Sequence, residues 1–97
     1  MSTLAVIIPA YNEEKSIADV VRSVISIASK NNLHAEIIVV NDSSADRTAE
    51  IIETLDCTSI HLPVNLGIGG AMQTGFKYAF ENNFDFEIGR ASCRERV

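Results

Sequence analysis

Residues 6–14 read Val-Ile-Ile-Pro-Ala-Tyr-Asn-Glu-Glu, so a hydrophobic run passes directly into polar side chains. The run begins at Leu4 and shows no alternation of polar and apolar residues, which is typical of a strand buried on both faces of a parallel sheet. Pro9 lacks the N–H that a strand ladder uses, and we expect it to end this strand. Ligands of open α/β sheets bind at the carboxyl ends of the strands, so the residues after Pro9 mark a candidate site.

A helix is expected after this segment. Apolar residues recur at helical spacing as far as Lys30. Asn12 is the expected N-cap, and Glu13 and Glu14 would lie in the first turn, where the helix dipole favours negative charge.

The rest of the chain continues the alternation of strand and helix patterns. The resulting β-α-β-α-β-α-β order predicts the α/β class, with a Rossmann-like parallel sheet and alternating helices. The later elements are expected as a strand over residues 35–40, a helix to about Leu55, a strand over residues 58–62, a helix to Glu81 or Asn82, and a fourth strand that begins at residues 84–86.

Three loops would then meet at one edge of the sheet, formed by residues 11–14, 42–44 and 65–70. The glycines of the third loop can expose backbone N–H groups to a phosphate at a helix N-terminus. They do not fit the G-x-G-x-x-G dinucleotide fingerprint, which would need glycine where Met72 stands, and no Gly-Lys-Ser/Thr follows.

Each candidate residue also has a structural interpretation that the sequence leaves open. Asp42 can serve as a helix cap, and Glu13 and Glu14 can serve only to complement a helix dipole. Tyr11 can be a rim side chain, and the glycines can serve only a tight turn. His34 and His61 lie apart in the sequence, and we interpret both as structural.

Composition limits the class of protein. The 97 residues carry a formal net charge of −5, which fits one small domain and argues against binding of nucleic acid. The first apolar run is too short for a signal peptide or a membrane span. The two cysteines, Cys57 and Cys93, show neither a disulfide framework nor metal-ligand spacing, and we expect a cytoplasmic location.

The last eleven residues break the pattern, because residues 87–97 are polar and contain three arginines. Residues 88–97 match the in-frame translation of a common sequencing adapter, whose next codon is a stop. We therefore expect a truncated native domain over residues 1–86 and a non-native tail over residues 87–97. The alternative is a native basic tail, and resequencing of the gene distinguishes the two.

Three motifs, taken in order, resemble the family 2 glycosyltransferases of GT-A fold. They are the stretch over residues 6–14, Ile-Val-Val-Asn-Asp-Ser-Ser-Ala-Asp-Arg-Thr over residues 38–48, and Asn-Leu-Gly-Ile-Gly-Gly-Ala-Met-Gln-Thr-Gly over residues 65–75. The resemblance covers residues 4–86 and implies the N-terminal half of a GT-A fold. Within the family, the sequence is most similar to the dolichyl- or polyprenyl-phosphate sugar transferases.

The resemblance implies a role for several residues. Pro9 and Tyr11 would line the nucleotide base, and Glu13 would contact the nucleoside. Asp42 would accept a hydrogen bond from the ring N–H of uracil or guanine, since an ionised carboxylate acts only as an acceptor.

The third motif contributes small residues, because Gly67, Gly69 and Ala71 would let the third helix approach the nucleotide. The chain departs from the family pattern at residues 41–44, which read Asn-Asp-Ser-Ser where many relatives have Asp-Asp-Gly-Ser. It also carries Val64 where some relatives place a charged or polar group.

The function implied by the resemblance is that of an inverting glycosyltransferase. It would transfer a sugar from a UDP- or GDP-sugar to a polyprenyl phosphate or saccharide acceptor, with Mg²⁺ or Mn²⁺ in the full-length enzyme, at the inner face of the membrane. The family's Asp-x-Asp metal motif and its general base lie beyond the fourth strand. We therefore expect no catalytic and no metal-binding residue in this chain, and predict that the chain alone is inactive.

The main alternative is a non-catalytic nucleotide-binding or regulatory α/β domain, such as a receiver-like module. A receiver would need a phosphorylatable aspartate after its third strand, where this chain has Pro63-Val64-Asn65, and a lysine after a fifth strand. A Rossmann oxidoreductase is a second alternative, which the glycine spacing argues against.

Overall fold

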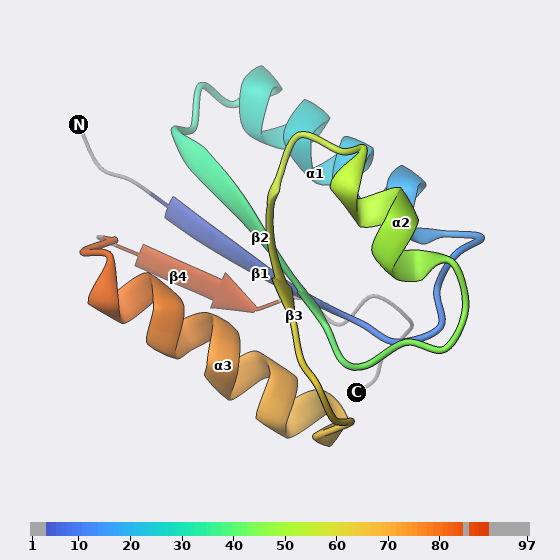
Figure 1. The fold of residues 1–97 in the computed structure, drawn as a ribbon. Helices are drawn as coiled ribbons and strands as arrows, with labels where there is room; N and C mark the ends of the chain where they lie inside the picture. Colours follow the sequence, from blue (N-terminus) through green and yellow to red (C-terminus); the bar gives the residue numbers. More distant parts are fainter. Residues whose placement is uncertain (1–3, 85, 90–97) are drawn as a thin grey trace.

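A computed structural model describes residues 4–84 and 86–89 as a parallel sheet between two layers of helices (Figure 1). The strands pair in the order β3-β2-β1-β4, and every pair is parallel. This confirms the expected Rossmann-like sheet with alternating helices. The elements are β1 (Leu4–Ala10), α1 (Ile17–Lys30), β2 (Ala35–Asn41), α2 (Thr48–Glu53), β3 (Thr58–His61), α3 (Gly67–Glu81) and β4 (Phe86–Gly89).

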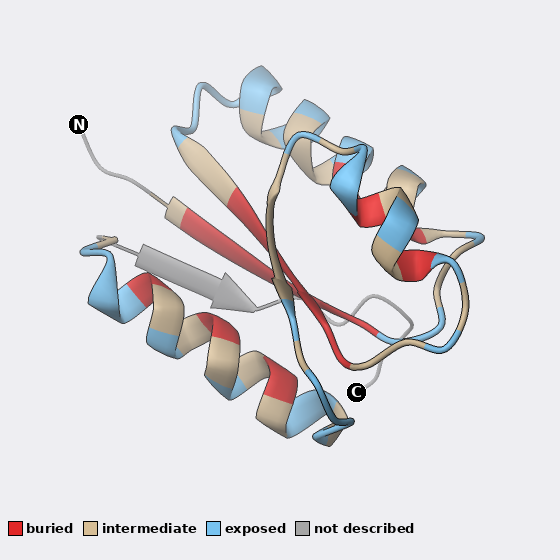
Figure 2. Ribbon diagram, in the orientation of Figure 1, coloured by how far each residue is buried: buried red, intermediate tan, exposed pale blue. Residues whose placement is uncertain are grey.

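The apolar run of β1 is continuous because both faces of the strand are covered. Figure 2 shows β1 and β2 buried along most of their length, with α1 and α2 over one face of the sheet and α3 over the other. Ile8 faces the cluster with α1 and α2, whereas its neighbour Ile7 faces the cluster with α3. Burial of such an aliphatic side chain contributes about 1.5–3 kcal/mol, so the central strands hold the three layers together.

Helix α3 lies close to the sheet because its inner face carries small residues. Ala71, Gly75 and Ala79 are buried at a spacing of four residues. A Cβ atom built on Gly75 would overlap Cγ2 of Ile7 in β1. The close approach of α3 to β1 therefore requires glycine at this position.

The expectation that Pro9 ends the first strand is wrong, since β1 continues to Ala10 with Pro9 in register with Val40. The carbonyl oxygen of Ala10 accepts the N–H of Asp42 at 2.8 Å, so the backbone groups of Pro9 point to the other side of the strand. On that side, the described part of β4 pairs with β1 only as far as Ile7. The missing N–H of proline thus interrupts no described ladder bond.

The expected N-cap of the first helix is also wrong, because α1 begins at Ile17 with Ser16 as its N-cap. The carbonyl oxygen of Glu13 accepts the N–H groups of Ser16 and Ile17 at 3.0 and 2.9 Å, and this turn delays the helix. Asn12 adopts φ 51°, a left-handed conformation that asparagine tolerates better than most residues. Glu13 and Glu14 therefore precede the helix and do not lie in its first turn.

The ends of the other elements agree with the expected ones to within about two residues. Helices α1 and α3 end at Lys30 and Glu81 as expected, and α2 ends at Glu53. The backbone of residues 87–89, assigned above to the tail, continues the strand that begins at Phe86. That pairing does not test where these residues came from, so the non-native tail stays a prediction, and residues 90–97 lie outside the described residues.

None of the helices in the described ranges is long and apolar enough to cross a lipid bilayer.

Candidate functional site

A cavity of about 280 Å³ lies at the carboxyl edge of the sheet, where the three polar loops meet. The chain adds β2 and β3 on one side of β1 and then β4 on the other side, so the strand order reverses at β1. Open α/β sheets bind ligands at such a switch point. Five of the seven predicted site residues line the cavity. The lining residues are Pro9, Ala10, Tyr11, Glu13, Asp42, Asn65, Gly67 and Ile68.

Asp42 is buried in the wall of this cavity, with 3% of its surface exposed. Its two carboxylate oxygens accept the backbone N–H groups of Leu66 and Gly67 at 2.7 and 2.9 Å. Its carbonyl oxygen accepts a hydrogen bond from the side-chain amide of Asn65 at 3.1 Å. Asp42 thus ties the end of β2 to the start of α3, whereas α2, the next helix in the sequence, has Arg47 as its N-cap.

This arrangement changes the interpretation of the glycine-rich loop. The N–H of Gly67 points to the Asp42 carboxylate, so it is not directed at a phosphate in this structure. Gly67 has φ 81°, a conformation that favours glycine, and this explains glycine at the turn into α3. Each Asp42 oxygen has a second lone-pair direction, so the carboxylate can still accept from a ligand.

The first loop supplies the opposite wall. Pro9 is buried at the end of β1, and Tyr11 is half exposed beside the cavity. The Glu13 side chain lines the cavity too, and its carboxylate accepts the hydroxyl of Ser16 at 2.9 Å. An aromatic ring, a carboxylate and an apolar floor therefore surround the same space.

The other two predicted residues lie outside the cavity lining. Gly69 is exposed in the first turn of α3, with no neighbour within 4 Å of a Cβ built there. Ala71 is fully buried against the sheet with Ile7 and Ile38. Contact of Gly69 or Ala71 with a nucleotide stays a prediction.

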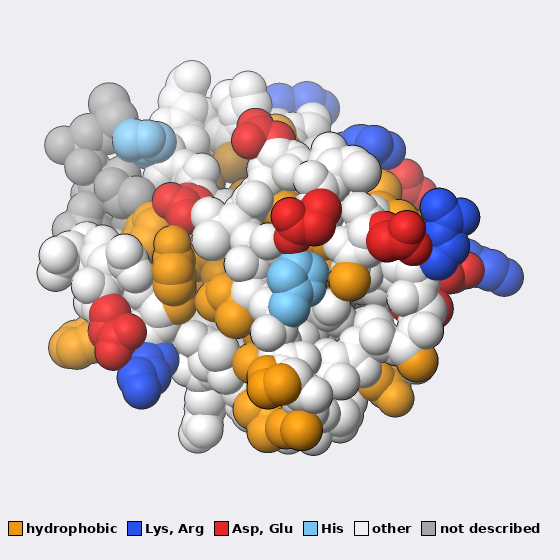
Figure 3. Space-filling model, viewed as in Figure 1, with side chains coloured by type: hydrophobic (Ala, Val, Ile, Leu, Met, Phe, Trp, Pro, Cys, Tyr) orange, Lys and Arg blue, Asp and Glu red, His pale blue; other side chains and the backbone are white. Residues whose placement is uncertain are grey.

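Hydrophobic side chains border the cavity on its outer side. Figure 3 shows hydrophobic side chains gathered at the lower edge of the molecule, over the loop between β3 and α3. Val64, Leu66 and Ile68 of this segment are each more than half exposed. The cavity therefore has a polar wall from β2 and an apolar rim from the start of α3.

The sequence did not reveal how the second loop holds the first. The side-chain oxygens of Ser44, Asp46 and Thr48 accept hydrogen bonds from the backbone N–H groups of residues 12–14. The signal was present as serine, aspartate and threonine crowded after a buried strand. Ser43 adopts φ 59°, a left-handed conformation that favours glycine, at the position where the family pattern has glycine.

The Asp46 carboxyl shows the electrostatic effect of these contacts. Burial raises its pKa, but hydrogen bonds from the Thr48 hydroxyl, the Thr48 N–H and the Glu14 N–H outweigh burial and hold the pKa below its usual value. These bonds stabilise the folded chain at neutral pH, and the stabilisation is lost as the pH falls through the lowered pKa.

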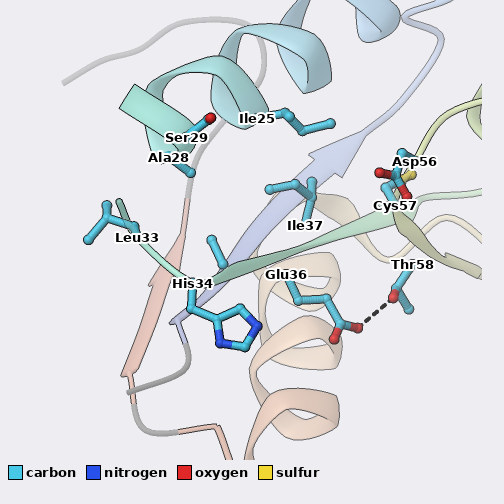
Figure 4. A pocket seen from close by; sticks show the side chains of 11 residues that line it. Ile25, Ala28, Ser29, Leu33, His34, Glu36, Ile37, Asp56, Cys57 and Thr58 are labelled. Carbon is cyan, nitrogen blue, oxygen red and sulfur yellow. Dashed lines mark hydrogen bonds between the residues drawn. The ribbon is translucent and has the colours of Figure 1, made fainter. Parts of the chain in front are cut away.

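A second hollow, of about 620 Å³, lies at the opposite edge, between the end of α1 and the starts of β2 and β3 (Figure 4). This hollow is larger than the cavity at the carboxyl edge. Two of its polar side chains are hydrogen-bonded to each other, since the Thr58 hydroxyl donates to the Glu36 carboxylate at 2.5 Å. Burial raises the pKa of the Cys57 thiol, and the negative charges of Glu53 and Asp56 add to this effect. The predicted site residues all lie elsewhere, so we place the functional site at the smaller cavity.

The two histidines lie outside the candidate site. His61 accepts a hydrogen bond from the Asn41 side-chain amide at Nδ1 and donates from Nε2 to Glu53 at 2.6 Å. The hydrogen bonds from His61 and from Ser59 lower the pKa of the Glu53 carboxyl. His34 is exposed at the second hollow, away from the candidate site.

The described residues do not fit a metal site. Within residues 4–84, no three side chains of histidine, cysteine, aspartate or glutamate lie together in a way that could hold an ion. Mg²⁺ or Mn²⁺ is expected only for the full-length enzyme, and we derive no step through it.

The sequence profile described as Glycosyl transferase family 2 matches residues 5–82. The chain belongs to glycosyltransferase family 2. The match contains all three motifs and both walls of the cavity. This match favours a glycosyltransferase over the receiver-like and oxidoreductase alternatives.

Two relatives of this family 2 chain are named as dolichyl-phosphate sugar transferases. The UDP-N-acetylglucosamine–dolichyl-phosphate N-acetylglucosaminyltransferase of Methanococcus voltae is 35% identical over 99 residues, covering 84% of this chain and 38% of the relative. A dolichyl-phosphate beta-glucosyltransferase of Trichomonas vaginalis is 39% identical over 83 residues, covering 75% of this chain and 25% of the relative. The chain thus spans well under half the length of these relatives.

The solved structure of TarS 1-349 from S. aureus in complex with UDP-GlcNAc has the same fold. The TM-score is 0.73 at 30% identity, and the match covers 95% of this chain and 26% of that one. The fold of this family 2 chain is accordingly that of the N-terminal half of a GT-A domain.

Proposed function

We propose that the cavity between Tyr11, Asp42 and Gly67 holds the nucleoside of a nucleotide-sugar donor. The observation that carries this proposal is that Pro9, Tyr11, Glu13, Asp42 and Gly67, assigned from three separate motifs, line one cavity. A further support is the name of the TarS complex, which contains UDP-GlcNAc. The donor is a UDP- or GDP-sugar.

The chemistry of the cavity suits a nucleobase. Tyr11 offers a half-exposed ring that can stack on the base, and Pro9 and Ala10 provide an apolar floor. The Asp42 carboxylate can accept the ring N–H that uracil and guanine share and that adenine lacks at the corresponding position. This pairing would select the base, because a buried acceptor left without its donor is costly.

In the longer protein, the sugar would be transferred with inversion to a polyprenyl phosphate or a saccharide. Support for a lipid-linked acceptor comes from relatives that are named as dolichyl-phosphate transferases. A divalent Mg²⁺ or Mn²⁺ would stabilise the departing diphosphate there. We further propose that this chain alone is inactive and that the longer protein works at the cytoplasmic face of a membrane.

Calorimetric titration of the 97-residue chain tests the proposal. UDP, GDP and ADP are titrated separately, and UDP-GlcNAc and GDP-mannose are incubated with the chain to look for turnover. We expect weak binding of UDP or GDP, weaker binding of ADP, and no turnover. Equal affinity for all three nucleotides would refute base selection by Asp42, and turnover or sub-micromolar, metal-dependent binding would refute the incomplete donor site.

A further inference from the structure

The loops after β1 and β2 are bound to each other by side-chain hydrogen bonds. Figure 1 shows the β1–α1 and β2–α2 connections running side by side at one end of the sheet. Each bond joins one loop to the other through a backbone N–H and a side-chain oxygen. The bonds are Asn12 N–H to Ser44 Oγ (3.0 Å), Glu13 N–H to Thr48 Oγ1 (2.8 Å), Glu14 N–H to Asp46 Oδ2 (3.3 Å), Ala45 N–H to Asn12 Oδ1 (2.8 Å) and Arg47 N–H to Glu14 Oε1 (2.9 Å).

Thr48 is the most buried member of this contact, with 0% of its surface exposed at the start of α2. Its hydroxyl accepts the N–H of Glu13 and donates to Oδ1 of Asp46 at 2.5 Å. A buried hydroxyl with both functions used fixes the direction of each partner. The backbone of Glu13 is thus attached to a rigid point of the neighbouring element.

Asp46 extends the attachment by one residue. Its Oδ1 also accepts the N–H of Thr48 at 2.9 Å, while Oδ2 takes the N–H of Glu14. One carboxylate therefore orients the threonine hydroxyl and holds the first loop directly. The lowered pKa of this carboxyl reflects the same contacts.

The first loop depends on this support because it lies outside regular structure. Residues 11–16 connect β1 to α1, and Asn12 within them adopts a left-handed conformation. Tyr11 and Glu13 line the cavity from this loop. A shift of the Glu13 backbone would therefore move the cavity wall, although neither Thr48 nor Asp46 lines the cavity.

We propose that Thr48 and Asp46 are positioning residues, which hold the backbone of Glu13 and Glu14 so that Tyr11 and Glu13 face the nucleoside opposite Asp42. This inference rests on the proposed function, since it takes the cavity to be the nucleotide site. Supporting residues of this kind set affinity through the geometry of the residues that touch the ligand.

The test compares the 97-residue chain with Thr48→Val, which keeps the shape and removes the hydroxyl, and Thr48→Ser, which keeps the hydroxyl. Asp46→Asn is a second, less buried variant in case Thr48→Val does not fold. Thr54→Val is the matched control, because the exposed hydroxyl of Thr54, the C-cap of α2, donates to the Ile51 carbonyl at the other end of that helix. Each variant is measured for hydrogen exchange at the Glu13 and Glu14 amides, for melting temperature and for the dissociation constant of UDP.

We expect Thr48→Val and Asp46→Asn to raise the Glu13 or Glu14 amide exchange rate and to weaken UDP binding by about tenfold or more. Thr48→Ser should keep the amide exchange rate and the UDP affinity close to the wild-type values, and Thr54→Val should change neither quantity. Unchanged amide exchange, or a UDP affinity that stays at the wild-type value in a folded Thr48→Val chain, would overturn the positioning role. If wild type fails to bind UDP, the proposed function falls, whereas the exchange data still report whether Thr48 holds the loop.

Discussion

Replacing Asp42 by alanine is expected to lower the free energy of unfolding by about 2–4 kcal/mol. The substitution removes the acceptor of the Leu66 and Gly67 N–H groups, which start α3 next to a buried strand end. N–H groups that are left unpaired at this partly buried helix start cost more than the hydrogen bond itself contributes. Urea unfolding followed by circular dichroism measures the loss.

Asp42→Asn separates the two roles of this residue. The amide keeps one acceptor oxygen for the helix start, so we expect a smaller loss of about 1 kcal/mol. Contact with a base ring N–H needs an acceptor on the cavity side. The loss in the free energy of UDP binding should therefore be larger than the loss in the free energy of unfolding. The exposed Asp56→Ala is the matched control, with an expected effect within about 0.5 kcal/mol. An Asp42→Ala chain as stable as wild type would contradict the role of Asp42 in holding the start of α3.

Replacing Gly75 by alanine is expected to destabilise the fold by about 1–3 kcal/mol, although alanine favours helix more than glycine does. The added Cβ would overlap Cγ2 of Ile7, which is fully buried in the central strand. Either α3 must move away from the sheet or Ile7 must leave its rotamer. Thermal unfolding of the variant measures the cost.

A double-mutant cycle tests the assigned contact directly. Ile7→Ala alone should cost about 2–5 kcal/mol through loss of packing. In that background Gly75→Ala should cost little, because the atom it would overlap is gone. Gly69→Ala is the matched control, since a Cβ there meets nothing within 4 Å and should be neutral or stabilising. Additive effects of the two core substitutions would show that Gly75 and Ile7 do not compete for space.

The sheet and the place of the site were predictable because they follow from local patterns. The apolar runs of β1 and β2 required cover on both faces, and parallel pairing brought their polar ends to one edge. Tyr11, Glu13 and Asp42 lie at that edge as expected, and all three line one cavity. These features depend on hydrophobic periodicity and on the order of strands and helices along the chain, and both can be inferred from the sequence.

Contacts between residues distant in sequence were not predictable in the same way. Asn12 has the chemistry of an N-cap, but its partners in the second loop draw it into a left-handed turn, and the helix starts at Ile17. Pro9 stays in β1 because its backbone nitrogen points away from β2, and this direction is set by the pairing register of the two strands. Thr48 resembles an ordinary helix start until its hydroxyl is seen on the Glu13 backbone. Each difference arises where tertiary contacts outweigh local preference.

The central claim is that the cavity at the carboxyl edge binds the nucleoside of a nucleotide sugar. A titration of the ¹⁵N-labelled chain with UDP, followed by amide chemical shifts, tests this claim most directly. We predict saturable shifts at Tyr11, Glu13, Asp42 and Gly67, with the residues of the second hollow around Cys57 unchanged. Shifts centred on the second hollow, or no shifts at millimolar UDP with a folded spectrum, would contradict it.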